Sequence, residues 1–156
     1  MLELTVSDVN GGSDSDTVSI QVNSAPDAPA LTGPSVTNST TPVLTGTAEI
    51  LNSVKLYEGS TELGQATADV SDGSFSITVS TLTEGSHTIT ATATDTASNT
   101  SVSSGAHTVV VDATNPVISL TGANPQNIEL GTTYAELDAT ANDNIDGDIS
   151  GDIVID

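Results

Sequence analysis

The stretch Ile89-Thr90-Ala91-Thr92-Ala93-Thr94-Asp95 decides the fold. Its small apolar residues alternate with threonine, which is the period-two pattern of a half-buried β-strand. The polar turn Thr96-Ala97-Ser98-Asn99 follows, and further along the chain Thr108-Val109-Val110-Val111-Asp112 gives a second strand of the same kind. The segment therefore predicts a β-hairpin in which each strand ends in an aspartate.

The same alternation extends over the rest of the chain, and helical patterns are nearly missing. Short apolar–polar runs are interrupted by Gly, Asn, Asp or Ser about every 8–12 residues, which is typical of an all-β sandwich. We expect seven strands in one complete domain, at about 30–37, 42–48, 52–58, 61–68, 73–80, 86–95 and 105–112. The side chains expected to face inward are Leu44, Val54, Leu56, Phe75, Ile77, Val79, Ile89, Ala91, Ala93, Val109 and Val111.

The opening hairpin is repeated near the N-terminus. Leu4-Thr5-Val6-Ser7-Asp8 leads through a polar turn to a second run that ends in Asn23, and a proline-containing connector follows both hairpins. The repeat predicts three units. They are the C-terminal hairpin of a truncated domain (1–24), one complete domain (27–112) and the N-terminal part of a further domain (116–156). Because strand-like residues follow Met1 at once, no signal peptide is expected, and we interpret the chain as part of a longer secreted protein.

Charge excludes several kinds of partner. The chain has 21 acidic residues against one lysine, with a net charge of −20 and a pI of about 4.1. No basic surface exists to bind DNA, RNA or an anionic membrane, so we expect cations as counterparts. Cysteine is absent, which excludes disulfides and thiolate chemistry. No apolar run is long enough to span a bilayer, so membrane insertion is not expected.

Catalytic residues are not indicated by any motif. His87 and His107 are too few and too far apart in sequence to suggest a zinc site, and no nucleophile elbow is present. Paired carboxylates could serve a glycosidase, but three aromatic residues cannot line a sugar-binding cleft. We therefore expect that the protein is not an enzyme.

Residues 30–112 resemble the bacterial immunoglobulin-like repeats of large surface adhesins and biofilm-associated proteins. The matching motifs are T-G-T-A, G-S-F-S, A-T-A-T-D and V-D-x-T-x-P, and His87 stands where these repeats usually carry an aromatic residue. Residues 116–156 resemble the start of another such repeat, and 2–23 resemble the end of a cadherin-like or polycystic-kidney-disease-type domain. The resemblance implies tandem immunoglobulin-like β-sandwiches that act as extracellular stalks at the bacterial surface, with Ca²⁺ stiffening their junctions.

Two sets of oxygen ligands are candidates for such junctions, since Ca²⁺ binds 6–8 oxygen atoms. The residues expected in these sets are Asp8, Asn23 and Asp27 at the first junction, and Asp95, Asp112 and Asn115 at the second. The alternative is that Asp95 only caps a turn, because Asx side chains accept hydrogen bonds from nearby backbone amides.

A third candidate is the acidic cluster Asp143, Asp146 and Asp148, which places three carboxylates within six residues. It is not an EF-hand, because no helices flank it and no glutamate stands at the twelfth position. We expect it in the third domain, near a junction beyond the end of this chain, either as a Ca²⁺ loop or as a solvated acidic turn. Asp14 and Asp16 are interpreted as part of a hairpin turn.

The main functional hypothesis is a structural spacer in an extracellular adhesin or surface filament, with neighbouring repeats as its partners and Ca²⁺ as its cofactor. One alternative is a module whose loops bind a glycan or a protein receptor, which would need an exposed aromatic residue such as Tyr57 or Tyr134. Another is a filament subunit, in which strands of one copy complete the sheets of the next. Lys55 is expected to face outward, which argues against an internal isopeptide bond.

Overall fold

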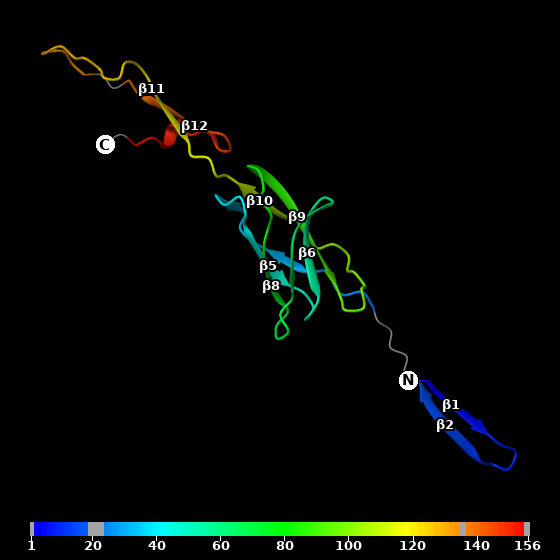
Figure 1. Cartoon of the computed structure of the whole chain (residues 1–156). Helices are drawn as coiled ribbons and strands as arrows, with labels where there is room; N and C mark the ends of the chain where they lie inside the picture. The colour runs from blue at the N-terminus through cyan, green and yellow to red at the C-terminus, as the bar shows by residue number, and fades with distance from the viewer. Residues whose placement is uncertain (1, 19–23, 135–136, 155–156) are drawn as a thin grey trace.

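The computed structural model describes residues 2–18, 24–134 and 137–154, and Figure 1 shows that the chain is built almost entirely from β-strands. The fold class predicted from the sequence is confirmed. The strands are β1 (Leu2–Ser7), β2 (Ser13–Val18), β3 (Ala30–Thr32), β4 (Val36–Thr37), β5 (Val43–Thr47), β6 (Ser53–Glu58), β7 (Thr61–Thr67), β8 (Ser74–Thr78), β9 (Gly85–Thr94), β10 (His107–Val111), β11 (Val117–Leu120), β12 (Ala139–Asp143) and β13 (Gly147–Asp148), with a 3₁₀ turn η1 (Ser150–Asp152).

The centre of the chain is a sandwich of two sheets, ordered β4-β10-β9-β6-β7 and β3-β5-β8. Its strand pairs are antiparallel except for β4 and β10, which are parallel. The strands expected in this region are present within about two residues of their predicted ends, a normal uncertainty for strand boundaries.

One predicted strand, 30–37, is divided in two. Its first part, β3, pairs with β5, and its second part, β4, pairs with β10 in the other sheet. The change occurs at Gly33 and Pro34. Proline has no N–H to donate to a sheet, and a Cβ at Gly33 would lie 2.5 Å from Cδ2 of Leu44. A side chain at this position would have to displace Leu44 of the core, so glycine lets the chain cross from one sheet to the other without that cost.

The core lies between the two sheets and contains every residue expected to face inward. Leu44, Val54, Leu56, Ile89, Val109 and Val111 are fully buried. Each such side chain contributes about 1.5–3 kcal/mol of hydrophobic stabilisation. Phe75 is the aromatic member of the core, and its ring packs beside Gly46, where a Cβ would lie only 2.5 Å from Cζ of Phe75.

Serine side chains complete the edge of β9 where β10 does not reach it. β10 pairs with residues 85–89 only, so the second half of β9 needs other partners on that side. Buried Ser104 accepts a hydrogen bond from Ala91 N–H at 2.8 Å, and buried Ser101 accepts one from Ala93 N–H at 2.9 Å. These two hydroxyls satisfy backbone groups that a paired strand would otherwise satisfy.

A smaller sheet, β11-β12-β13, follows the sandwich. All four residues of β11 are exposed, including Val117 and Ile118, which point to opposite faces. Ala141 is buried, and its N–H donates to Ser150 Oγ at 3.0 Å. In Figure 1 this sheet lies next to the end of the sandwich where β10 terminates. The N-terminal pair β1-β2 forms a separate two-stranded sheet.

Candidate metal centre

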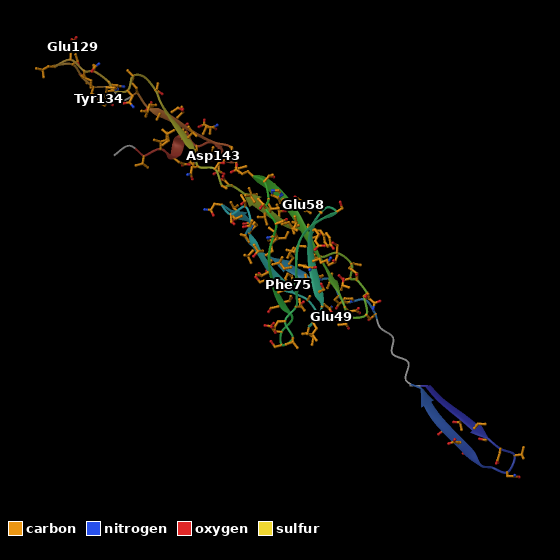
Figure 2. The ribbon with its side chains drawn as sticks, in the orientation of Figure 1. Glu49, Glu58, Phe75, Glu129, Tyr134 and Asp143 are labelled. Carbon is orange, nitrogen blue, oxygen red and sulfur yellow. The ribbon has the colours of Figure 1, made fainter. Side chains whose placement is uncertain are left out.

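The antiparallel pairing of β9 and β10 determines which acidic residues can meet. Gly85, the first residue of β9, pairs with Val111, the last residue of β10. Glu84 and Asp112 therefore lie at the same end of the sandwich, measured along the strands. The turn after β12 reaches this end as well, and Figure 2 shows Asp143 between the small sheet and the sandwich.

Three carboxylates converge there. One oxygen from each of Asp112, Asp143 and Asp146 lies within 4.8 Å of the other two. Asp143 is buried, and its Oδ1 accepts hydrogen bonds from the backbone N–H of Ile145 at 2.8 Å and of Asp146 at 3.2 Å, which fixes its orientation. The site combines the last strand of the sandwich with a turn of the following sheet.

Asp112 is the member of the cluster with an unsatisfied atom. Its Oδ1 is buried and has no hydrogen-bond partner among the described residues, a costly state for a carboxylate oxygen. Burial raises the pKa of Asp112 above its ordinary value, and the negative charges of Asp143, Asp146 and Glu84 raise the pKa further. A cation in the cluster would offset the repulsion among the carboxylates.

Glu84 is a residue of this site that the sequence analysis did not identify. Its Oε1 accepts hydrogen bonds from Thr114 Oγ1 at 2.5 Å and from Ala113 N–H at 3.2 Å, and its Oε2 accepts one from the Asn144 side chain. The Thr114 hydroxyl is the main reason why the pKa of Glu84 is lowered, and Asn144 and Ala113 lower it further. Glu84 thus connects the sandwich, the linker and the small sheet.

The expected grouping of Asp95 with Asp112 is wrong. Asp95 follows the last residue of β9, whereas Asp112 lies beside the first, so the whole strand separates them. Asp95 caps its own turn: Oδ1 accepts from the N–H of Ala97 and of Asn99, both at 2.9 Å, and Oδ2 accepts from the Asn99 side chain. This is the turn-capping alternative given by the sequence.

Asp8 has the same role in the N-terminal hairpin. Its Oδ1 accepts from the N–H of Asn10 at 2.8 Å and of Gly12 at 2.9 Å, as Asp95 does at the matching positions. Because 19–23 lie outside the described residues, the expected set of Asp8 with Asn23 and Asp27 stays a prediction. Asp14 and Asp16 lie within β2, after the turn rather than in it.

The remaining predicted ligands are placed elsewhere. Asp148 accepts hydrogen bonds from the N–H and hydroxyl of Ser150 and lies outside the three-carboxylate cluster. Asp27 is exposed, and its N–H donates to Glu49 Oε1 at 2.9 Å. Asn115 is exposed in the linker, and Asn23 lies outside the described residues. The sequence predicts the acidic cluster near a junction beyond the end of this chain. In the structure, Asp143 and Asp146 instead lie close to Asp112, where the sandwich meets the small sheet.

A family model described as bacterial Ig-like domain matches residues 14–113. The chain belongs to this family. No curated protein matches it in sequence. Bacterial Ig-like domains are non-catalytic structural folds and usually lie outside the cell or at its surface. Within residues 2–18, 24–134 and 137–154, no helix has the length and apolar character needed to cross a membrane.

Lys55, the single lysine of this bacterial Ig-like domain, faces outward as expected. Its Nζ lies 2.8 Å from Glu62 Oε2 on the neighbouring strand β7. Both side chains are more than a third exposed, so the pair contributes little to stability.

Proposed function

We propose that this chain is a spacer segment of an extracellular bacterial surface protein, in which Ca²⁺ stiffens the junction between the sandwich and the following sheet. The observation that carries the proposal is the convergence of Asp112 with Asp143 and Asp146 from the next unit. Asp112 also has a buried oxygen without a partner among the described residues. A metal held by both units would fix their relative orientation, which is what a stalk requires.

The donor set fits calcium. All three side chains offer hard oxygen ligands, and the cluster includes no sulfur or imidazole, the ligands that favour zinc or copper. Ca²⁺ accepts irregular sets of 6–8 oxygens, so three carboxylates can be supplemented by carbonyls or water. Mg²⁺ demands near-ideal octahedral geometry and retains its water, so we expect it to bind more weakly.

Binding is linked to order at the junction. Calcium that binds only when Asp112 and the Asp143 turn are together stabilises that arrangement by RT ln(1 + [L]/Kd), about 2.7 kcal/mol when free calcium is 100 times Kd. In its absence, the three carboxylates repel one another. The ion would therefore convert a self-repelling joint into a fixed one.

The test is a calcium titration by calorimetry on the intact chain and on Asp112→Asn and Asp146→Asn. Each substitution keeps the shape of the side chain and removes one charged ligand, so affinity should fall by about tenfold or more. Asp95→Asn is the matched control, because it changes a capping aspartate at the far end of the sandwich and should leave affinity unchanged. Small-angle scattering should show a longer maximum dimension in calcium than in chelator.

Two results would contradict the proposal. One is no measurable binding of calcium by the unaltered chain, together with identical scattering curves in calcium and chelator. The other is equal loss of affinity in the Asp95 and Asp112 variants, which would place the ion elsewhere or indicate general unfolding.

A second candidate function is assembly of like chains through strand complementation. The observation that favours it is β11, whose residues Val117, Ile118 and Leu120 are each more than 60% exposed. Because a strand with apolar residues on both faces normally packs against a second layer, another copy could cover it. Light scattering tests this candidate: a mass that rises with concentration supports it, and a strict monomer contradicts it.

A further inference from the structure

His87 is buried between two oxygen atoms. Its Nδ1 lies 2.9 Å from Glu58 Oε1, and its Nε2 lies 2.9 Å from the backbone carbonyl of Thr83. A carbonyl oxygen and an ionised carboxylate can only accept hydrogen bonds. A neutral imidazole has one N–H and one bare nitrogen, so it can donate to only one of them. Both contacts are hydrogen bonds only when the ring carries both protons.

These contacts connect the strand β6 to the loop before β9. Glu58 is the last residue of β6, and Thr83 immediately precedes Glu84. In Figure 2 Glu58 lies at the end of the sandwich that faces Asp143. The His87 ring therefore contacts the residue next to the glutamate that binds the linker at Ala113 and Thr114.

The charged surroundings of His87 are simple. Among the described residues, Glu58 is the ionisable side chain that contacts the ring. On β10 the residue paired with His87 is Val109, which is apolar, and on β7 Glu62 is paired with Lys55. The preceding loop carries Glu84, whose oxygens are engaged with the linker and the small sheet.

We propose that His87 is a positioning residue for the junction. As an imidazolium it holds Thr83, and through Thr83 it holds the Glu84 carboxylate against the linker. Loss of the second proton leaves a nitrogen lone pair facing an oxygen, which releases one of the two contacts and loosens the loop. The inference extends the proposed function by naming a control on the same junction, but the bonds of Glu84 are made to protein groups and need no metal.

The experiment uses the intact chain in chelator, so that calcium has no part in it. ¹⁵N NMR of the ring nitrogens reports the protonation state of His87, and hydrogen exchange of the Ala113 amide, corrected for intrinsic rates, reports the hold of Glu84 on the linker. As the pH is raised until the ring-nitrogen signals show a neutral His87, we expect protection of Ala113 to fall about fivefold or more, the equivalent of one hydrogen bond.

Glu58→Gln gives the decisive comparison. The side-chain amide that this substitution introduces can donate to a bare Nδ1 while the neutral ring donates from Nε2 to Thr83, so both contacts survive without the second proton. Protection of Ala113 should then be independent of pH. His107→Gln is the matched control, because His107 contacts only the carbonyl of Pro34 among its described neighbours, and this variant should behave as the unaltered chain.

The inference is overturned if protection of Ala113 in the unaltered chain does not change with pH, or if Glu58→Gln shows the same pH dependence as the unaltered chain. Failure of calcium binding in calorimetry, with this pH dependence intact, would reject the proposed function alone. Calcium binding with no pH effect on Ala113 would reject the role of His87 alone.

Discussion

Replacing Ser104 with alanine tests how the long strand β9 is held. In the structure, the buried hydroxyl of Ser104 accepts a hydrogen bond from Ala91 N–H and donates one to the carbonyl of Gly105, both at 2.8 Å. Alanine removes the hydroxyl and leaves a buried N–H without a partner, which costs about 1–3 kcal/mol. In a domain of about 60–100 residues, each kcal/mol lowers Tm by about 4–8 °C. We therefore expect Ser104→Ala to lower Tm by about 4–24 °C.

Circular dichroism melts and urea unfolding would measure this change, and hydrogen exchange would show faster exchange at the Ala91 amide. Ser103→Ala is the matched control, because Ser103 is its exposed neighbour and its loss should change stability by less than about 0.5 kcal/mol. Ser101→Ala should resemble Ser104→Ala, since Ser101 has the same role toward Ala93. Equal melting temperatures for the Ser103 and Ser104 variants would refute the reasoning.

Three further predictions concern a close contact and two aspartates. Gly46→Ala should lower Tm, because a Cβ would lie 2.0 Å from the backbone carbonyl oxygen of Ala30 and 2.5 Å from Cζ of Phe75, and overpacking costs about 1–3 kcal/mol. An unchanged melt would contradict this. The side-chain amide of Asn99, and next its backbone N–H, lower the pKa of Asp95 from its ordinary value of 3.8. The Asp95 carboxylate therefore stabilises the folded state above pH 3.8, and this stabilisation is lost as the pH falls through the lowered pKa. Asp95→Ala should therefore lower Tm at pH 7, with a difference that narrows in melts below about pH 4; a constant difference would contradict the assignment. Burial, and next the neighbouring negative charges, raise the pKa of Asp112, so its ionised carboxylate destabilises the folded state above that pKa. Asp112→Asn should therefore raise Tm in chelator, where this charge is unfavourable, and lower Tm in calcium, where a ligand is lost. A lower Tm in both buffers would count against the site.

The strands and the core could be predicted from the alternation of apolar and polar residues. Leu44, Ile89 and Val109 are fully buried as expected, since the side-chain period of a strand depends only on local sequence. The division of 30–37 was missed, although Gly33-Pro34 is a recognisable signal for a break. The local sequence pattern predicts where each strand begins and ends, but it does not predict which of the two sheets a strand joins.

The candidate site was predicted only in part, because its composition depends on which ends of the strands meet. Asp95 and Asp112 each follow the last residue of a strand, but the two strands are antiparallel, so these residues lie at opposite ends of the sandwich. The same geometry places Glu84, just before β9, beside Asp112, and this could have been inferred from the hairpin alone. The contact with Asp143 could not, because nothing in the linker sequence specifies how the small sheet is oriented.

The change of sheet at Gly33 has a mechanical consequence. β4 and β10 run parallel, joined by hydrogen bonds from Val110 N–H to Ser35 O and from Asp112 N–H to Thr37 O. The chain enters the sandwich through the short segment that contains β3 and β4 and leaves it just after β10, so tension along the chain pulls β4 and β10 in opposite directions along their length. The bonds between them are then loaded in shear and must rupture together, instead of opening one after another as in a zipper. A short crossing between sheets thus places the resistance of the domain to force at the strand that leads to the three-carboxylate cluster.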